Sequence, residues 1–181
     1  MRVITGSARG RKLKTLEGTD LRPTTDKVKE SMFNILQFCI EGRRVLDLFA
    51  GSGQLGIEAL SRGAESATFV DASKNAVAVV KQNLQTVGLA DNARVVCTDS
   101  ISFLRTADRQ YDIVFLDPPY GNGLLIKAMA LLPEVMSEYG IVVCEHPSDE
   151  HLPDSFGGFE LQKHYRFGKI TLTVYRKEAQ E

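Results

Sequence analysis

The residues with the clearest chemical potential in this chain are Asp117, Pro118, Pro119 and Tyr120, which directly follow the apolar run of residues 111–116. A run of this length and composition is typical of a buried parallel strand. Proline has no N–H donor, so two prolines in succession end the strand. Ligands bind at the carboxyl ends of parallel strands in open α/β sheets. A carboxylate, a rigid carbonyl and an aromatic ring placed there suit a planar base that carries an exocyclic amino group.

Such an amino group is a poor nucleophile, because its lone pair is delocalised into the ring. The Asp117 carboxylate and the Pro118 carbonyl could each accept one of its two N–H hydrogens and so turn the lone pair toward a methyl donor. Tyr120 could stack on the base and hold it in line with that donor. The alternative is a plain turn made of two prolines and a packed tyrosine.

A glycine-rich segment precedes these residues. Gly51, Gly53 and Gly56 have the spacing G-x-G-x-x-G, after a predicted strand at residues 45–49. Glycines at these positions allow a tight turn, close approach of a ligand and close packing of helix against strand. Asp71 follows Gly51 by twenty residues, the separation that is typical of an acid on the ribose of a bound nucleotide.

Three acids distinguish between candidate ligands. Asp47 lies just before the segment of Gly51, Gly53 and Gly56, called the glycine loop below. There it would repel a pyrophosphate and favour an ammonium group. Asp71 and Asp99 end the next two predicted strands and could accept hydrogen bonds from ribose hydroxyls and from an adenine amino group. Together they fit S-adenosylmethionine better than NAD. The alternative is that Asp71 and Asp99 are helix N-caps, since each precedes a predicted helix.

The elements that position these residues alternate along the chain. Predicted strands at residues 45–49, 67–70, 94–97, 111–116 and 140–144 alternate with predicted helices at residues 54–62, 74–87, 100–105 and 124–132. This order predicts βαβ units in a parallel sheet. An earlier helix is expected to begin at Thr24–Asp26. Residues 159–167 and 169–176 predict an antiparallel hairpin at the sheet edge, and residues 2–5 and 11–15 predict two short strands near the amino terminus.

Charge is distributed unevenly along the chain. Residues 1–29 carry a net charge of +5, and the remaining residues carry −6, for a total of −1. A basic arm on an acidic domain indicates a polyanionic partner at one end. The alternative is a solvated tail that only increases solubility.

Length and composition limit the class of protein. The chain has 181 residues, enough for one domain with its own core and a small appendage. No apolar run approaches the ~20 residues needed to span a bilayer. The three cysteines lie far apart in apolar segments and read as reduced core residues of a cytoplasmic protein. Neither they nor the three histidines have the spacing of a metal site, so no metal is expected.

Several segments resemble a known family. Asp117–Tyr120 resembles the [D/N/S]-P-P-[Y/F/W] signature of amino-group methyltransferases. The block of residues 22–36, the loop of residues 47–53 and residues 58–64 are similar to the bacterial 16S ribosomal RNA guanine-N2 methyltransferase family. The block of residues 22–36 is the most specific of these, and the likeness extends over nearly the whole chain. Gln54 stands where a small residue is expected, which leaves the first helical turn in question.

The resemblance implies an α/β fold of the Rossmann-like class I methyltransferase type. Its sheet would be mostly parallel and seven-stranded with an antiparallel last strand, and helices would cover both faces. Residues 1–24 would be a basic N-terminal β-hairpin extension and residues 25–181 the methyltransferase domain. The acceptor would be the N2 amino group of a guanine in small-subunit ribosomal RNA, either as naked RNA or within an assembling 30S particle. Nothing in the sequence demands a dimer, so a monomer is expected.

The resemblance also assigns residues to the site. The catalytic pocket would be Asp117, Pro118, Pro119 and Tyr120. The residues that hold S-adenosylmethionine would be Asp47, Phe49, Ala50, Gly51, Ser52, Gly53, Asp71, Ala72, Asp99 and Ser100. The RNA phosphates would be gripped by Arg2, Arg9, Arg11, Lys12, Lys14 and Arg22. Two other functions stay open, a DNA adenine-N6 methyltransferase and a non-catalytic RNA-binding assembly module of the same fold.

Overall fold

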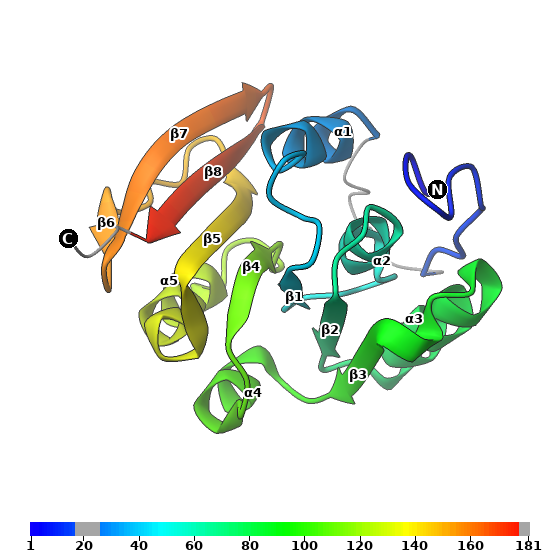
Figure 1. Ribbon diagram of the computed structural model, residues 1–181. Helices are drawn as coiled ribbons and strands as arrows, with labels where there is room; N and C mark the ends of the chain where they lie inside the picture. Colours follow the sequence, from blue (N-terminus) through cyan, green and yellow to red (C-terminus); the bar gives the residue numbers. More distant parts are fainter. Residues whose placement is uncertain (17–25, 178–181) are drawn as a thin grey trace.

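A computed structural model describes residues 1–16 and 26–177 of the chain. Within them eight strands form one sheet in the order β3-β2-β1-β4-β5-β8-β7-β6 (Figure 1). Strands β1 to β5 run parallel, and β8, β7 and β6 follow β5 in antiparallel pairs. The bounds are Arg44–Asp47 (β1), Ser66–Asp71 (β2), Ala93–Cys97 (β3), Tyr111–Leu116 (β4), Met136–Pro147 (β5), Ser155–Phe156 (β6), Phe159–Phe167 (β7) and Ile170–Lys177 (β8).

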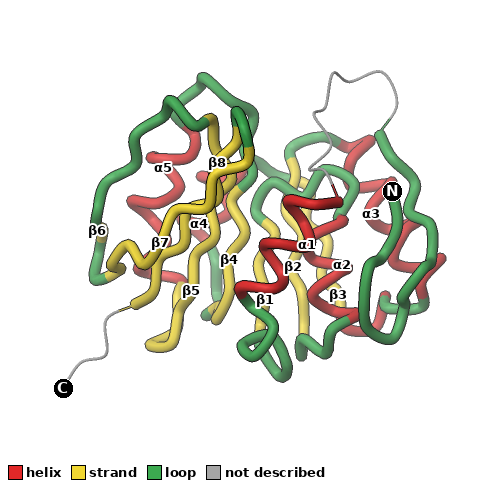
Figure 2. The backbone as a smooth tube through the Cα atoms, turned by 90° about the horizontal axis from the view of Figure 1, so that it is seen from above, coloured by secondary structure: helices red, strands yellow, loops and turns green. Residues whose placement is uncertain are grey.

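Within the described residues, five α-helices cover the two faces of this sheet (Figures 1 and 2). Helices α1, α2 and α3 contribute to one buried cluster, and α4 and α5 contribute to a second cluster on the other face. Because both faces are covered, β4 is buried at every position. The bounds are Asp26–Ile35 (α1), Gln54–Ser61 (α2), Lys74–Val87 (α3), Ser100–Thr106 (α4) and Leu124–Leu131 (α5), with short 3-10 turns at Ala90–Asn92 and Leu132–Val135.

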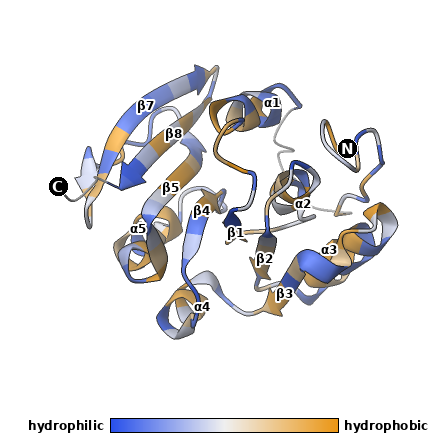
Figure 3. Cartoon of the chain, in the orientation of Figure 1, coloured by the Kyte–Doolittle hydropathy of each residue, from blue (hydrophilic) through white to orange (hydrophobic). Residues whose placement is uncertain are grey.

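The α/β architecture with a parallel sheet, helices on both faces and a reversed last strand is confirmed. The strand count is eight rather than seven, because Ser155–Phe156 forms a two-residue strand on the outer side of β7. So short a strand shows no alternation of polar and apolar residues from which it could be predicted. Its Phe156 ring stacks on Phe159 and meets the edge of Tyr175. Strand β7 beside it is mostly hydrophilic (Figure 3), as suits a strand near a sheet edge.

The amino-terminal segment of residues 1–16, called the arm below, folds back on itself. In place of the two predicted strands it has a single antiparallel bridge between Arg2 and Lys12, flanked by turns. Its apolar side chains Val3, Ala8 and Leu13 are buried in the same cluster as α1 to α3. The arm is therefore packed on the helices. The division of the chain at residues 24 and 25 stays a prediction, since residues 17–25 lie outside the described ranges, as does the expected helix start at Thr24.

A buried carboxylate on α2 holds the arm. Glu58 is 0% exposed, and its two oxygens accept hydrogen bonds from the backbone N–H groups of Ile4 (2.8 Å) and Thr5 (2.9 Å). Its charge is balanced by Lys29 at 3.3 Å and Arg62 at 2.9 Å. Burial lowers the pKa of Lys29, and the ion pair with Glu58 opposes that shift. An ionised carboxylate without these partners would be costly in such a place.

A second set of hydrogen bonds joins the arm to the glycine loop. The Asn83 side chain on α3 accepts from the Lys14 N–H (2.8 Å) and donates to the carbonyls of Lys14 (3.0 Å) and Ser52 (2.9 Å). Ser61 adds a further contact, since its hydroxyl accepts from the Ala8 N–H at 3.0 Å. The arm is thus fixed to α2, to α3 and to the loop that precedes α2.

Replacing Lys29 by methionine keeps an unbranched buried side chain but leaves the Glu58 carboxylate with Arg62 as its one cationic partner among these residues. We expect the free energy of unfolding to fall by on the order of 3 kcal/mol, measured by urea denaturation. Lys27→Met, at an exposed position of the same helix, is the matched control and should change that free energy by less than about 0.5 kcal/mol. Equal stability of the two variants would contradict the role given to the ion pair.

Candidate functional site

A cavity of about 620 Å³ opens at the carboxyl ends of the parallel strands. This carboxyl-edge cavity lies where β1, β2, β4 and β5 end, and its volume is in the usual range for small-molecule sites. It is lined by Leu16, Leu48, Phe49, Gly51, Asp71, Ala72, Ala76, Asp99, Ser100, Asp117, Pro118, Pro119, Tyr120, Leu124 and Glu145. The Asp117–Tyr120 turn and the glycine loop therefore face one shared space.

Most of the residues predicted for catalysis or cofactor binding line this cavity. Those that do are Phe49, Gly51, Asp71, Ala72, Asp99, Ser100 and Asp117 to Tyr120. Four predicted residues, Asp47, Ala50, Ser52 and Gly53, do not line it. Ser52 is buried beside the arm, with its hydroxyl 3.5 Å from the sulfur of Met1. The roles predicted for all these residues in binding a ligand stay predictions.

The glycine loop has the geometry that its spacing predicts. Gly51 has a φ of 54°, a left-handed value that favours glycine, and a Cβ there would face open space. Gly56 is the third residue of α2, and a Cβ on it would collide with the ring of Phe69 on β2. The first glycine thus leaves room at the cavity, and the last allows the helix to pack closely on the sheet.

Asp71 anchors the loop from the end of β2. Its carboxylate accepts hydrogen bonds from the N–H groups of Gly51 (2.9 Å) and Ser73 (2.8 Å). A carboxylate offers about four acceptor positions, so it can accept from a ligand in addition. The N-cap of α3 is Ser73, so the alternative reading of Asp71 as a helix cap is wrong.

Asp99 has the capping role that the alternative reading gave it. It is the N-cap of α4, and its carboxylate accepts from the Ser102 N–H at 2.9 Å. This hydrogen bond lowers the pKa of Asp99, so the group is ionised at neutral pH. Because Asp99 also lines the cavity, capping and ligand contact are compatible at this position.

Asp47 lies behind the loop. It is 2% exposed, and its carboxylate accepts from the Gly56 N–H at 3.0 Å. Burial raises the pKa of Asp47 to about 7, against the opposing effect of this hydrogen bond. The Asp47 side chain therefore positions the start of α2, and its protonation state changes near neutral pH.

Glu145 is the acid of the cavity that the sequence analysis missed. It follows Cys144 on β5 and is 2% exposed, although the cavity reaches it. Its carboxylate accepts a hydrogen bond from the Tyr120 hydroxyl at 3.3 Å. The signal that could have found it was the one used for the other acids, a carboxylate at the end of a predicted parallel strand. Leu16 and Leu124, also missed, bring apolar surface from the arm and from α5.

The arm presents its basic side chains to solvent. Those of Arg2, Arg9, Arg11, Lys12 and Lys14 are exposed, and Arg11 donates a hydrogen bond to the carbonyl of Thr86 on α3 at 2.9 Å. The end of the described arm, Leu16, lies at the cavity, so a basic surface leads toward the site. Arg22, also predicted to bind RNA, lies outside the described residues.

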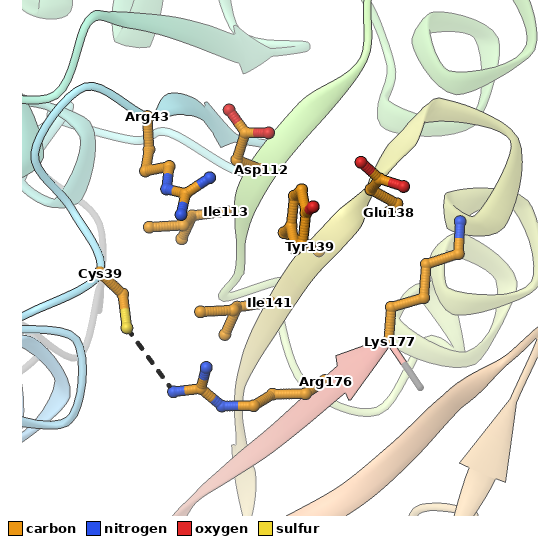
Figure 4. Close-up of a pocket in the computed structure, with 10 residues that line it drawn as sticks. Cys39, Arg43, Asp112, Ile113, Glu138, Tyr139, Ile141, Arg176 and Lys177 are labelled. Atoms are coloured by element: carbon orange, nitrogen blue, oxygen red, sulfur yellow. Dashed lines mark hydrogen bonds between the residues drawn. The ribbon is translucent and has the colours of Figure 1, made fainter. Parts of the chain in front are cut away.

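A second cavity, of about 480 Å³, lies at the opposite edge of the sheet, where β4 begins and β8 ends (Figure 4). Its walls include three cations and two acids, and the Arg176 guanidinium donates to the sulfur of Cys39 at 3.8 Å. Asp112 there is held by the guanidinium of Arg44 at 3.1 Å. No residue predicted for catalysis or cofactor binding lines this cavity.

In residues 1–16 and 26–177, no cluster of three or more histidine, cysteine, aspartate or glutamate side chains is arranged to hold a metal ion. None of the helices in these ranges has the length and apolar character needed to cross a bilayer.

Comparisons with known proteins agree with the geometry. A model of the family described as Conserved hypothetical protein 95 matches residues 1–176. YlbH of Bacillus subtilis (strain 168) is 43% identical over 184 residues, which cover 99% of this chain and 100% of the relative. Ribosomal RNA small subunit methyltransferase D of Escherichia coli (strain K12) is 38% identical over 182 residues, with coverage of 99% and 91%. The solved structure of yhhF from Escherichia coli matches with a TM-score of 0.90 at 38% identity, over 99% of both chains.

The raised pKa of Asp47 makes a prediction about stability. The folded protein holds the Asp47 proton up to about pH 7, whereas the ordinary pKa of a free aspartate side chain is 3.8. The contribution of this group to stability is therefore fully present below about pH 4 and is lost as the pH rises through about 7. Asp47→Asn abolishes the titration, while its amide oxygen can still accept from Gly56. Relative to the variant, the wild-type free energy of unfolding should fall by up to about 1.4 kcal/mol per pH unit between pH 5 and pH 7.

The measurement is chemical denaturation of both cofactor-free proteins at fixed ionic strength. Parallel stability curves for wild type and Asp47→Asn would show that folded Asp47 binds no more protons than unfolded Asp47 in this range, and so would contradict the raised pKa.

Proposed function

This chain belongs to the family described as Conserved hypothetical protein 95, and we propose that it transfers a methyl group from S-adenosylmethionine to the exocyclic N2 amino group of a guanine in small-subunit ribosomal RNA. One observation carries the proposal: the Asp117–Tyr120 turn and the glycine loop line the same cavity. The Escherichia coli relative named Ribosomal RNA small subunit methyltransferase D supports both the reaction class and the RNA.

The residues of the cavity fit S-adenosylmethionine. Open space beside Gly51 leaves room for a ligand at the loop, and the Asp71 carboxylate on the same wall can accept from ribose hydroxyls. Asp99 and Ser100 would lie at the adenine end. A bound ammonium group would favour the ionised form of Asp47 behind the loop. When bound, S-adenosylmethionine supplies an electrophilic methyl group on its sulfonium.

The turn after β4 would prepare the amino group. The Asp117 carboxylate and the Pro118 carbonyl accept its two hydrogens, so the nitrogen lone pair points away from them and toward the methyl group. The Tyr120 ring, 37% exposed at the cavity, offers a stacking surface worth roughly 1–3 kcal/mol. Positioning of this kind can supply about 7–11 kcal/mol of the barrier without a covalent enzyme intermediate.

The arm would supply the contacts to RNA outside the cavity. Its exposed cations can bind phosphates and orient the RNA without reading its sequence. Because Glu58 and Asn83 hold the arm against α2 and α3, these cations keep a constant position relative to the cavity. A stacked target base would still have to swing out, at a cost of a few kcal/mol.

The direct test of the reaction is mass spectrometry of ribosomal RNA from cells with and without this protein. One N2-methylguanosine in small-subunit RNA should disappear when the protein is absent. Incubation of the purified protein with S-adenosylmethionine, using naked RNA and particles from the deficient cells in parallel, should restore it in at least one of them. Methylation of DNA adenine in place of RNA guanine would overturn the proposal.

Asp117→Ala tests the role of the carboxylate. We expect kcat to fall by at least about 10²-fold, because one of the two acceptors that orient the amino group is lost. Binding of S-adenosylmethionine, measured by calorimetry, should stay within a few-fold of wild type. Asp149→Ala, at an exposed position after β5, is the control and should leave kcat unchanged. Unchanged turnover in Asp117→Ala would remove this residue from the mechanism.

The arm makes a prediction about salt. Replacing Arg9, Arg11 and Lys12 together by alanine should reduce the slope of log affinity for RNA against log salt concentration by roughly 2–3, because up to three phosphate contacts are lost. The matched control replaces three cations of the terminal hairpin, Lys163, Arg166 and Lys169, by alanine and should keep the wild-type slope. An arm variant with the wild-type slope would mean that the arm does not touch RNA.

A further inference from the structure

Two acids lie on neighbouring strands at the end of the carboxyl-edge cavity where the target base is proposed to bind. Strands β4 and β5 are parallel neighbours, with Leu116 paired to Cys144. Asp117 and Glu145 are the next residues on each strand, and neighbouring strands lie about 4.8 Å apart. Both side chains line the cavity. The proposed reaction uses one of these acids, Asp117, and leaves Glu145 without a role.

The position of Glu145 is unusual for a carboxylate. It is 2% exposed in the described residues, and burial of a charged group is costly unless it is hydrogen-bonded. The Tyr120 hydroxyl donates to it at 3.3 Å, which ties it to the ring proposed to stack on the base. A carboxylate can accept at about four positions, so it can accept from the Tyr120 hydroxyl and from a donor on a ligand as well.

The two candidate bases differ at the atom next to the amino group. Guanine carries N1–H beside its N2 amino group, so its edge is a row of donors. Adenine has a bare N1 lone pair beside its N6 amino group, so its edge has one donor and one acceptor. A carboxylate next to the amino-group acceptor is attracted to the first base and repels the second.

We propose that Glu145 accepts a hydrogen bond from N1–H of the target guanine and thereby selects guanine over adenine. This rests on the proposed function, because it assumes that Asp117 and Pro118 hold the amino group. Glu145 is then a specificity-determining residue, and its contact with Tyr120 fixes the angle between the stacking ring and the edge of the base.

Glutamine at position 145 separates this role from a purely structural one. Its amide oxygen can still accept from Tyr120, so the ring stays in place. Its amide nitrogen adds a donor, which repels guanine N1–H and matches a base with a bare N1. The probe is 2-aminopurine, which keeps the 2-amino group of guanine but has no hydrogen on N1.

The experiment compares small-subunit RNA fragments that carry either guanine or 2-aminopurine at the mapped target. The value measured is the ratio of kcat/KM for guanine to kcat/KM for 2-aminopurine. Any intrinsic difference in reactivity between the bases cancels when this ratio is compared between enzymes. In Glu145→Gln it should fall by at least about tenfold, with a rise in the absolute rate on 2-aminopurine. Glu138→Gln, at an exposed position of the same strand, should keep the wild-type ratio.

The outcomes are separable. A wild-type enzyme that methylates the guanine RNA, together with a Glu145→Gln variant of unchanged ratio, overturns the role of Glu145 and leaves the proposed function in place. A wild-type enzyme that forms no N2-methylguanosine overturns the proposed function itself. Thermal unfolding and binding of S-adenosylmethionine by Glu145→Gln should match wild type. If they do not, Glu145→Asp, which keeps the acceptor on a shorter side chain, should retain the wild-type preference for guanine, and loss of that preference would also count against the inference.

Discussion

The direction of five parallel strands is the constraint on which the rest of this structure depends. Because β1 to β5 all end at one edge, acids from distant parts of the chain lie around one cavity. Like charges so close together are unfavourable. The structure offsets this with backbone donors: Gly51 for Asp71 and Ser102 for Asp99. The same hydrogen bonds fix the glycine loop and the start of α4, so charge balance and loop geometry have one cause.

Helix α2 connects the two parts of the site. Its amino end follows the glycine loop, and its buried Glu58 binds the backbone of the arm through Ile4 and Thr5. Asn83 makes a second connection, from the Lys14 backbone to the Ser52 carbonyl within the loop. The proposed RNA surface and the proposed cofactor loop are therefore parts of one packed unit. An arm that is bound in this way loses little further conformational entropy when it meets its partner.

Much of the fold, and the positions of the turn after β4 and of the glycine loop, could be predicted from the order of residues. Alternating strand and helix patterns predict the parallel sheet, and the two prolines predict where β4 stops. The spacing of Gly51, Gly53 and Gly56 predicts the loop, because only local backbone geometry is involved. The arm was predicted as two strands, yet it forms one bridge, since its stability comes from side chains on α1, α2 and α3 that are remote in sequence.

The sequence by itself determined which residue types could do chemistry and at which strand ends they lie, because strand and turn signals act over a few residues. Tertiary structure alone decided which of them share the cavity. It placed Asp47 behind the loop and brought Glu145 to the hydroxyl of Tyr120. These outcomes depend on the register between neighbouring strands and on burial. Both are set by packing between segments far apart in the chain, which no local pattern of residues specifies.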